Sequence, residues 1–115
     1  MKSRPRLAAP DLSPEFCTRR LKALADRTRW DVVARLLDGP LTVTELTDML
    51  TLDQTLLSHH LKILRDEGFV EFTREGKKKR YRLARDVQLT RSGRGIDLGC
   101  CTLELKPPAR RPRHT

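Results

Sequence analysis

The sequence predicts a mainly α-helical domain with a β-hairpin wing, the fold class called winged helix-turn-helix. A pair of helices joined by a tight turn over residues 42–67, and a hairpin with a lysine-rich tip directly after them, carry this prediction. The formal net charge of +9, from 24 Lys and Arg against 15 Asp and Glu, adds a preference for a polyanionic partner. In such a fold the second helix of the pair enters the major groove of DNA.

The length of 115 residues corresponds to one domain with a limited core. Only 37% of the residues are hydrophobic and 4% are aromatic, so a dimer interface would supplement the small buried surface. The basic charge favours nucleic acid first and an acidic membrane surface second. No stretch approaches the roughly 20 apolar residues of a membrane span, and residues 1–13 lack the apolar centre of a secretory signal. We therefore expect a cytoplasmic protein without a membrane partner.

Two helices are expected early in the domain, after a basic, proline-containing and flexible segment at residues 1–12. Ser13 followed by Pro14 is a helix start, because serine caps free N–H groups and proline suits the first helical position. Asp26 can cap the second helix. The apolar residues of this second helix recur at i, i+3, i+4 and i+7, at Trp30, Val33, Ala34 and Leu37.

The next two helices have equally clear starts. Thr42 with Glu45 three residues later is a capping-box pattern that opens a short third helix. After a tight turn, Asp53 caps a fourth helix that should run to about Glu67. The fourth helix has a leucine stripe on one face and polar residues on the other. The stripe consists of Leu57, Leu61 and Leu64.

The last part of the domain is expected to be β-structure. Residues 69–74 and 79–84 alternate apolar and polar side chains, which predicts a β-hairpin. Residues 96–105, IDLGCCTLEL, are short and apolar and are predicted to form one further strand. Residues 106–115 are rich in Pro and Arg and free of acidic residues, which predicts a disordered basic tail. The winged helix-turn-helix domain is therefore expected to span residues 13–105.

The fourth helix and the hairpin tip expose residue types that suit DNA contacts. Gln can bond bidentately to adenine, Ser and Thr hydroxyls serve bases or phosphates, and Lys suits guanine or phosphate. A basic hairpin tip would follow the phosphate backbone, a contact that weakens steeply with salt. The predicted contact residues are Gln54, Thr55, Ser58, His59 and Lys62 on the helix, and Lys77, Lys78, Lys79 and Arg80 on the hairpin. The alternative is a solvated helix face and a lysine run that serves solubility.

The stretch at residues 21–83 resembles the ArsR/SmtB family of bacterial winged-helix repressors. The LKALADRTR opening, the SHHLKILRDEGFV run and the REGKKKRYRL hairpin carry this resemblance. It implies a homodimer that binds an inverted-repeat DNA operator and leaves it when an inducer binds, often a metal, a metalloid or an oxidant. By the same resemblance Gln54, Thr55, Ser58 and His59 occupy base-reading positions, although arginine is commoner where His59 stands. The family usually ends in a helix, for which the predicted C-terminal strand would substitute.

Cys17, Cys100 and Cys101 are the candidate sensing residues. In a reducing compartment they would be free thiols, metal ligands or redox switches. Many arsenic-sensing members of the family carry a Cys-Val-Cys pair where this chain has Thr42-Val43-Thr44, and threonine hydroxyls are poor ligands for soft ions. Because the family's first helix and post-wing segment both approach the dimer interface, the resemblance implies that the three thiols could converge. A thiolate set would select arsenite, antimonite or another soft metal ion; the alternatives are small buried hydrophobes and a redox or persulfide signal.

The leading hypothesis is a transcriptional repressor that needs no cofactor and is released by a thiol-reactive inducer, with arsenite favoured. The alternative is a winged-helix module that docks a protein partner and uses its basic tails non-specifically. An enzyme is not expected, because the sequence has no phosphate-cradling glycine loop and no evident cysteine-histidine pair. His60, beside Leu61, is expected to be a buried, hydrogen-bonded histidine of the fourth helix rather than a ligand.

Overall fold

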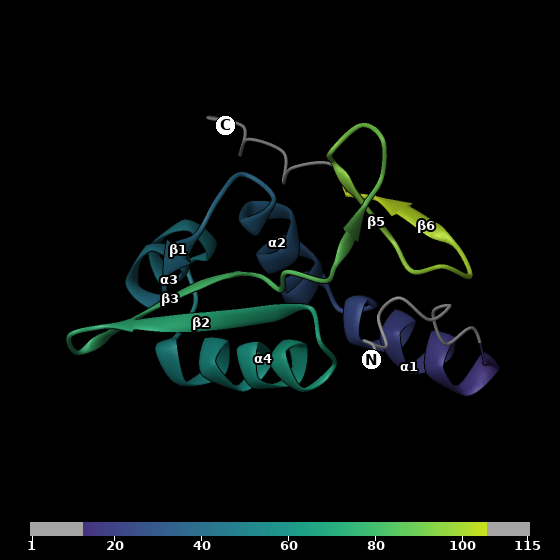
Figure 1. Ribbon diagram of the computed structural model, residues 1–115. Helices are drawn as coiled ribbons and strands as arrows, with labels where there is room; N and C mark the ends of the chain where they lie inside the picture. The colour runs from purple at the N-terminus through teal and green to yellow at the C-terminus, as the bar shows by residue number, and fades with distance from the viewer. Residues whose placement is uncertain (1–12, 106–115) are drawn as a thin grey trace, which may run out of the picture.

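The computed structural model describes residues 13–105, which contain four helices and six short strands (Figure 1). The predicted flexible segment at 1–12 and the predicted basic tail at 106–115 lie outside the described residues. No helix within the described range is long and apolar enough to cross a membrane. The elements are α1 (Pro14–Leu24), α2 (Arg27–Leu36), β1 (Leu41–Thr42), α3 (Val43–Leu50), α4 (Gln54–Asp66), β2 (Val70–Glu75), β3 (Lys78–Leu83), β4 (Gln88–Leu89), β5 (Gly95–Asp97) and β6 (Thr102–Glu104).

All four helices start where the sequence predicted. The Asp26 carboxylate accepts a hydrogen bond from the backbone N–H of Arg29 over 3.0 Å. Asp53 accepts from two N–H groups in the first turn of α4, over 3.0 and 3.2 Å. Ser13 and Thr42 cap α1 and α3 in the same way. Because these caps satisfy donors that have no partner inside the helix, local sequence is enough to set each start.

The core forms where α2, α3 and α4 meet the wing sheet. The predicted stripe of α4 is confirmed, since Leu57, Leu61 and Leu64 are at most 1% exposed. Gly68 follows α4 with a φ of +83°, a left-handed conformation that ends the helix at low steric cost. Phe69 comes next and is completely buried. Burying each such side chain contributes about 1.5–3 kcal/mol, so the core side of α4 is determined and its polar face points to solvent.

The wing is a three-stranded antiparallel sheet in the order β1-β3-β2. The predicted hairpin is confirmed, and its turn contains Gly76 at a φ of +65°. Phe72 pairs with Tyr81 across the hairpin, with ring centroids 5.2 Å apart. Strand β1 was not predicted, because Thr42 was recognised only as a helix cap. The pairing of Thr42 in β1 with Arg80 in β3 attaches the wing to the helix-turn-helix.

The C-terminal sheet differs from the prediction. Residues 96–105 were predicted as one strand, but they contribute to two strands of a separate antiparallel sheet in the order β4-β5-β6. The chain turns around Gly99, which has a φ of +89°, and the Asp97 carboxylate accepts a hydrogen bond from the Gly99 N–H over 2.8 Å. The prediction of strand rather than helix is confirmed, and the single continuous strand is wrong. Cys100 and Cys101 consequently lie ahead of β6.

Three connections hold this sheet against the helices. A disulfide joins Cys17 of α1 to Cys100, with the two Cα atoms 6.6 Å apart. Ile96 is buried in the main core. Arg94 donates a hydrogen bond from Nη1 to the Asp38 carboxylate over 2.7 Å. Figure 1 shows the resulting arrangement, in which β5 and β6 lie near α1 and α2 at the end of the molecule away from the wing tip.

Candidate nucleic-acid interface

A groove of about 390 Å³ separates α4 from the wing, with the start of α3 as a third wall. Positions 54, 58 and 62 are four residues apart, so they share one face of α4. The wing lysines approach the same groove from the other side. Six of the nine predicted contact residues therefore line one surface: Gln54, Ser58, Lys62, Lys77, Lys78 and Lys79.

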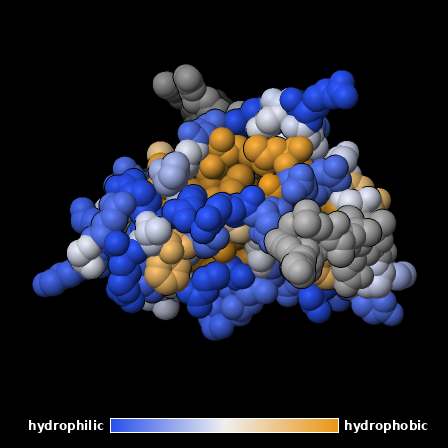
Figure 2. Space-filling view, in the orientation of Figure 1, coloured by the Kyte–Doolittle hydropathy of each residue, from blue (hydrophilic) through white to orange (hydrophobic). Residues whose placement is uncertain are grey.

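The charge of this groove favours a polyanion. Its described lining contains basic and neutral side chains and no carboxylate. Figure 2 shows hydrophilic residues over the wing end and along most of the α4 edge, while apolar residues gather near the middle of the view. A concave surface lined by one sign of charge concentrates the opposite charge. The groove is thus electrostatically suited to a phosphodiester backbone.

Five lining residues were not among the predicted contacts, namely Thr42, Val43, Thr44, Arg65 and Tyr81. Arg65 of α4 lies three residues after Lys62 and seven after Ser58, so helical spacing alone could have placed it on this face. Thr44 enters the groove from the first turn of α3, and no local signal marked it. Thr55 and His59 are exposed on α4 but do not line the groove.

The predicted wing-tip cations differ in how firmly they are held. Lys77 and Lys78 are exposed, and neither forms an ion pair with an acidic side chain among residues 13–105. The Lys79 ammonium lies 4.8 Å from the centroid of the Phe72 ring, a cation–π contact that leaves its charge available. The Lys62 ammonium lies 2.9 Å from the Asp66 carboxylate, but that pair is exposed and so is easily exchanged for another anion.

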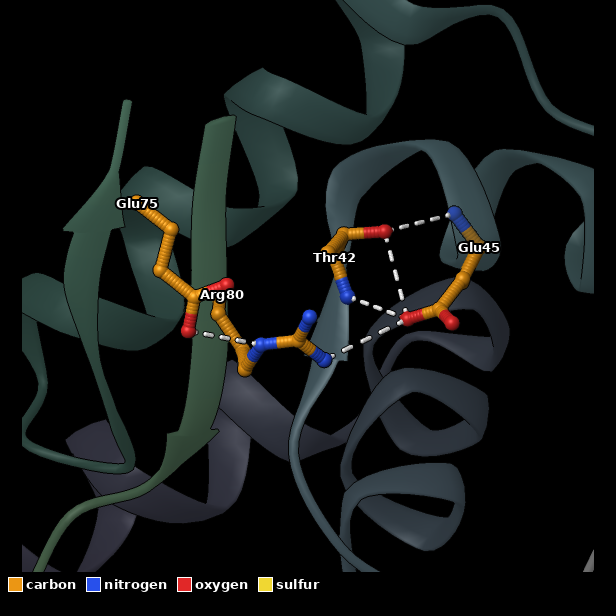
Figure 3. Close-up of polar contacts among 4 residues, drawn as sticks. All are labelled: Thr42, Glu45, Glu75 and Arg80. Carbon is orange, nitrogen blue, oxygen red and sulfur yellow. Dashed lines mark hydrogen bonds and ion pairs between the residues drawn. The ribbon is translucent and has the colours of Figure 1, made fainter. Parts of the chain in front are cut away.

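Arg80 is engaged by acidic residues of the protein itself (Figure 3). Its Nε donates a hydrogen bond to Glu75 over 2.9 Å, and its Nη1 lies 3.7 Å from Oε1 of Glu45. The hydrogen bond to Glu75 raises the pKa of Arg80 above its usual value. The hydrogen bond from the Thr42 backbone N–H lowers the pKa of Glu45, so that its carboxylate is charged at neutral pH. The sequence did not indicate that Glu75 and Glu45 would be the partners of Arg80.

His60 is a buried residue of α4, as predicted, with 8% of its surface exposed. Arg29 of α2 donates a hydrogen bond from Nη1 to His60 Nδ1 over 3.0 Å, so we assign the proton of the neutral ring to Nε2. Asp26 lies 3.9 Å from the same ring nitrogen. Burial lowers the pKa of His60 below its usual value of 6.5 and outweighs the opposing effect of Asp26. The histidine is therefore a neutral link between α2 and α4.

The three predicted sensing cysteines are not all brought together. Cys17 is buried and Cys100 is exposed, and the disulfide between them links residues 83 positions apart in sequence. Cys101 is a free, partly buried thiol that packs against the core. Within residues 13–105 no group of three or more His, Cys, Asp or Glu side chains could hold a metal ion. A disulfide has no thiolate to donate, so this pair would bind a soft ion only after reduction.

Comparison with known proteins identifies the family. The profile described as "Bacterial regulatory protein, arsR family" matches residues 26–71. The probable mercury resistance operon repressor of Streptomyces lividans is 36% identical in an alignment of 101 positions, which covers 81% of this chain and 81% of that protein. This chain belongs to the ArsR family. Four other curated relatives match over a shorter stretch, and the chain spans only 47% to 59% of their lengths.

Solved structures of similar proteins support the same assignment for this ArsR family member. HlyU from Vibrio cholerae shares 36% identity at a TM-score of 0.60, over 63% of this chain and 78% of that one. The homodimeric winged helix-turn-helix DNA-binding domain Mb0332 from Mycobacterium bovis shares 29% identity at a TM-score of 0.59, over 72% and 73%. The predicted fold class is confirmed. The protein is a DNA-binding transcriptional regulator of this family and not an enzyme.

Proposed function

We propose that this ArsR family member is a repressor that binds an inverted-repeat operator as a homodimer and is released by a thiol-reactive inducer. The observation that carries the DNA part is the groove that α4 and the wing share, with its basic and neutral lining. One recognition helix reads too few bases for operator specificity, which supports a dimer with two half-sites. The homodimeric state of the similar domain Mb0332 supports it as well.

The base-reading role falls to the exposed N-terminal half of α4. Gln54, Thr55, Ser58 and His59 point away from the leucine core of this helix and offer amide, hydroxyl and imidazole groups to base edges. Lys62 and the wing lysines Lys77, Lys78 and Lys79 would contact phosphates, which fix the register on the duplex without reading sequence.

The sensing role falls to the cysteines. After reduction, Cys17 and Cys100 would offer two neighbouring thiolates, and Cys101 is the next residue in the chain. Thiolates select soft ions, and arsenite or antimonite is the inducer that we favour. The resemblance to a mercury resistance operon repressor supports soft-ion sensing in general.

A redox response is the second candidate, and the Cys17–Cys100 disulfide favours it. Oxidation of the two thiols forms the bond between the sulfur atoms, while two protons and two electrons leave to the oxidant. The bond ties α1 to the C-terminal sheet, so its formation or loss would change how these two elements are held. Such a change would be the signal in a repressor that binds no metalloid.

Fluorescence anisotropy with DNA from upstream of its own gene tests the DNA part. We expect a specific, salt-sensitive complex of the reduced protein that the double replacement Ser58→Ala and His59→Ala weakens. Gln88→Ala, an exposed polar position on β4, is the matched control. If the double variant binds as tightly as the wild type, a protein-docking module becomes the better assignment.

Anaerobic titration of the reduced complex tests the sensing part. Release by arsenite that is lost in both Cys17→Ser and Cys100→Ser supports the metalloid inducer. Release only by a thiol oxidant supports the redox alternative. If neither treatment releases the DNA, the thiol mechanism is wrong, whereas the DNA-binding assignment stands.

A further inference from the structure

Arg80 lies at the junction between the wing and the helix-turn-helix. In the sheet register it is opposite Thr42 of β1 on one side and Thr73 of β2 on the other. Its guanidinium spans two carboxylates, Glu75 at 2.9 Å from Nε and Glu45 at 3.7 Å from Nη1. Figure 3 shows the guanidinium between these two acids. Arg80 is also absent from the lining of the groove between α4 and the wing.

Glu45 makes this contact more than an isolated surface pair. Its Oε1 also accepts hydrogen bonds from the backbone N–H of Thr42 over 2.8 Å and from the Thr42 hydroxyl over 3.2 Å. The Thr42 hydroxyl in turn accepts from the Glu45 N–H over 3.1 Å, which completes the capping box of α3. The carboxylate that caps α3 therefore also attracts a wing side chain.

The wing lysines are placed differently. Lys77, Lys78 and Lys79 line the groove and form no close ion pair among the residues that the structure describes, although the charge of Lys78 contributes to the lowered pKa of Glu45. A phosphate approaching the wing meets three available ammonium groups there. At Arg80 it would compete with two carboxylates, one of which is hydrogen-bonded to Nε and the other of which lies beside Nη1.

We propose that Arg80 is a positioning residue, which holds the wing against the first turn of α3 through Glu45 and Glu75, and that it makes no phosphate contact. The inference rests on the proposed DNA-binding function. A wing that is fixed before binding lets its lysines contact phosphates while α4 lies in the major groove of the DNA. Binding then costs less ordering than it would with a loose wing.

The two possible roles of Arg80 differ in their salt dependence. The plot of log K against log salt concentration has a negative slope, and each phosphate contact that is lost reduces the magnitude of this slope by about 0.9. As a positioning residue, Arg80→Gln should weaken operator binding about two- to fivefold, the scale of an exposed ion pair, and leave this slope unchanged. As a phosphate contact it should lower the slope.

Glu45→Gln separates the roles by the sign of its effect. Glutamine keeps the capping box, because its side-chain oxygen still accepts from Thr42, but it removes the charge that attracts Arg80. A positioning role predicts that this variant binds more weakly than the control Asp48→Asn, which removes the same charge from an exposed position of α3. It also predicts that the Glu45→Gln and Arg80→Gln effects are less than additive, because both break one contact.

Stoichiometric titration with operator DNA gives the active fraction of each variant, which separates weaker binding from partial unfolding. A lower salt slope in Arg80→Gln, or tighter binding in Glu45→Gln than in Asp48→Asn, would overturn the inference. If the wild type itself shows no specific, salt-sensitive binding, the proposed function fails instead.

Discussion

Arg29 of α2 donates a 3.0 Å hydrogen bond from Nη1 to Nδ1 of His60 in α4, so the recognition helix is tied to the preceding helix by a buried neutral imidazole. The Nε of the same arginine donates to the backbone carbonyl of Ala23, over 2.6 Å. One side chain thus links the end of α1, the start of α2 and the buried side of α4. Protonation of His60 would remove the acceptor and place a second cation beside Arg29.

The free energy of unfolding should therefore fall as the pH is lowered through the range below about 6.5. Burial lowers the pKa of folded His60 below the 6.5 of the unfolded chain, so the unfolded state takes up more protons there. The groups that face the ring are Arg29, Asp26 and the neighbouring His59, of which only Asp26 favours the charged form. Urea unfolding measured between about pH 5 and 8 tests this.

His60→Asn is the matched variant for this measurement, because its amide oxygen can still accept from Arg29 and has no proton to gain. We expect it to flatten the dependence over the same range. An equally steep fall in His60→Asn would assign the pH dependence to another group.

The disulfide should stabilise the oxidised protein. Cys17→Ser and Cys100→Ser should each lower the free energy of unfolding by about 2–4 kcal/mol without reductant, since the cross-link restrains a long stretch of the unfolded chain. Both variants should be insensitive to reductant, whereas the wild type loses stability when it is reduced. Denaturant unfolding with and without a thiol reductant measures this. Cys101→Ser serves as the control, because it removes a free thiol and leaves the disulfide in place. Equal stability of reduced and oxidised wild type would contradict the prediction.

The α3 cap should be measurable at Thr42. Thr42→Ala removes the hydroxyl that accepts from the Glu45 N–H and should cost about 1 kcal/mol, which thermal unfolding can detect. Thr42→Ser keeps the hydroxyl and should recover most of the loss. If the serine and alanine variants are equally destabilised, the lost methyl group rather than the cap is responsible.

The wing lysines should govern the salt dependence of DNA binding. Lys77→Gln and Lys78→Gln should each lower the salt slope by about 0.9 and weaken binding similarly on every DNA sequence, because phosphate contacts carry no base information. Arg91→Gln removes an equal charge from an exposed position before β5, away from the groove, and should leave the slope nearly unchanged. Anisotropy titrations at several salt concentrations make this comparison. If all three variants have the same slope, the lysines do not contact phosphates.

The helices and the hairpin of this protein could be predicted because their signals are local. A serine, threonine or aspartate cap acts within three residues of its partner, and the alternation of residues 69–84 shows a hairpin without knowledge of the rest. The basic tip and the polar face of α4 follow from the same short-range patterns. Six of the nine predicted contact residues consequently line the groove.

The remaining features depend on residues that are far apart in the chain. Residues 96–105 were predicted as one strand because they are mostly apolar, and this pattern gave no sign of the turn at Gly99. The disulfide unites cysteines 83 positions apart, and no periodicity encodes such a pairing. Arg80 looked like a fourth free cation of the wing until folding placed it beside Glu45. The sequence alone thus determined the winged helix-turn-helix and its DNA-facing chemistry, through short-range hydrogen bonds and hydrophobic periodicity. Only the tertiary structure decided which thiols meet and which cations are held by the protein itself, because ion pairing and cross-linking depend on distance in space.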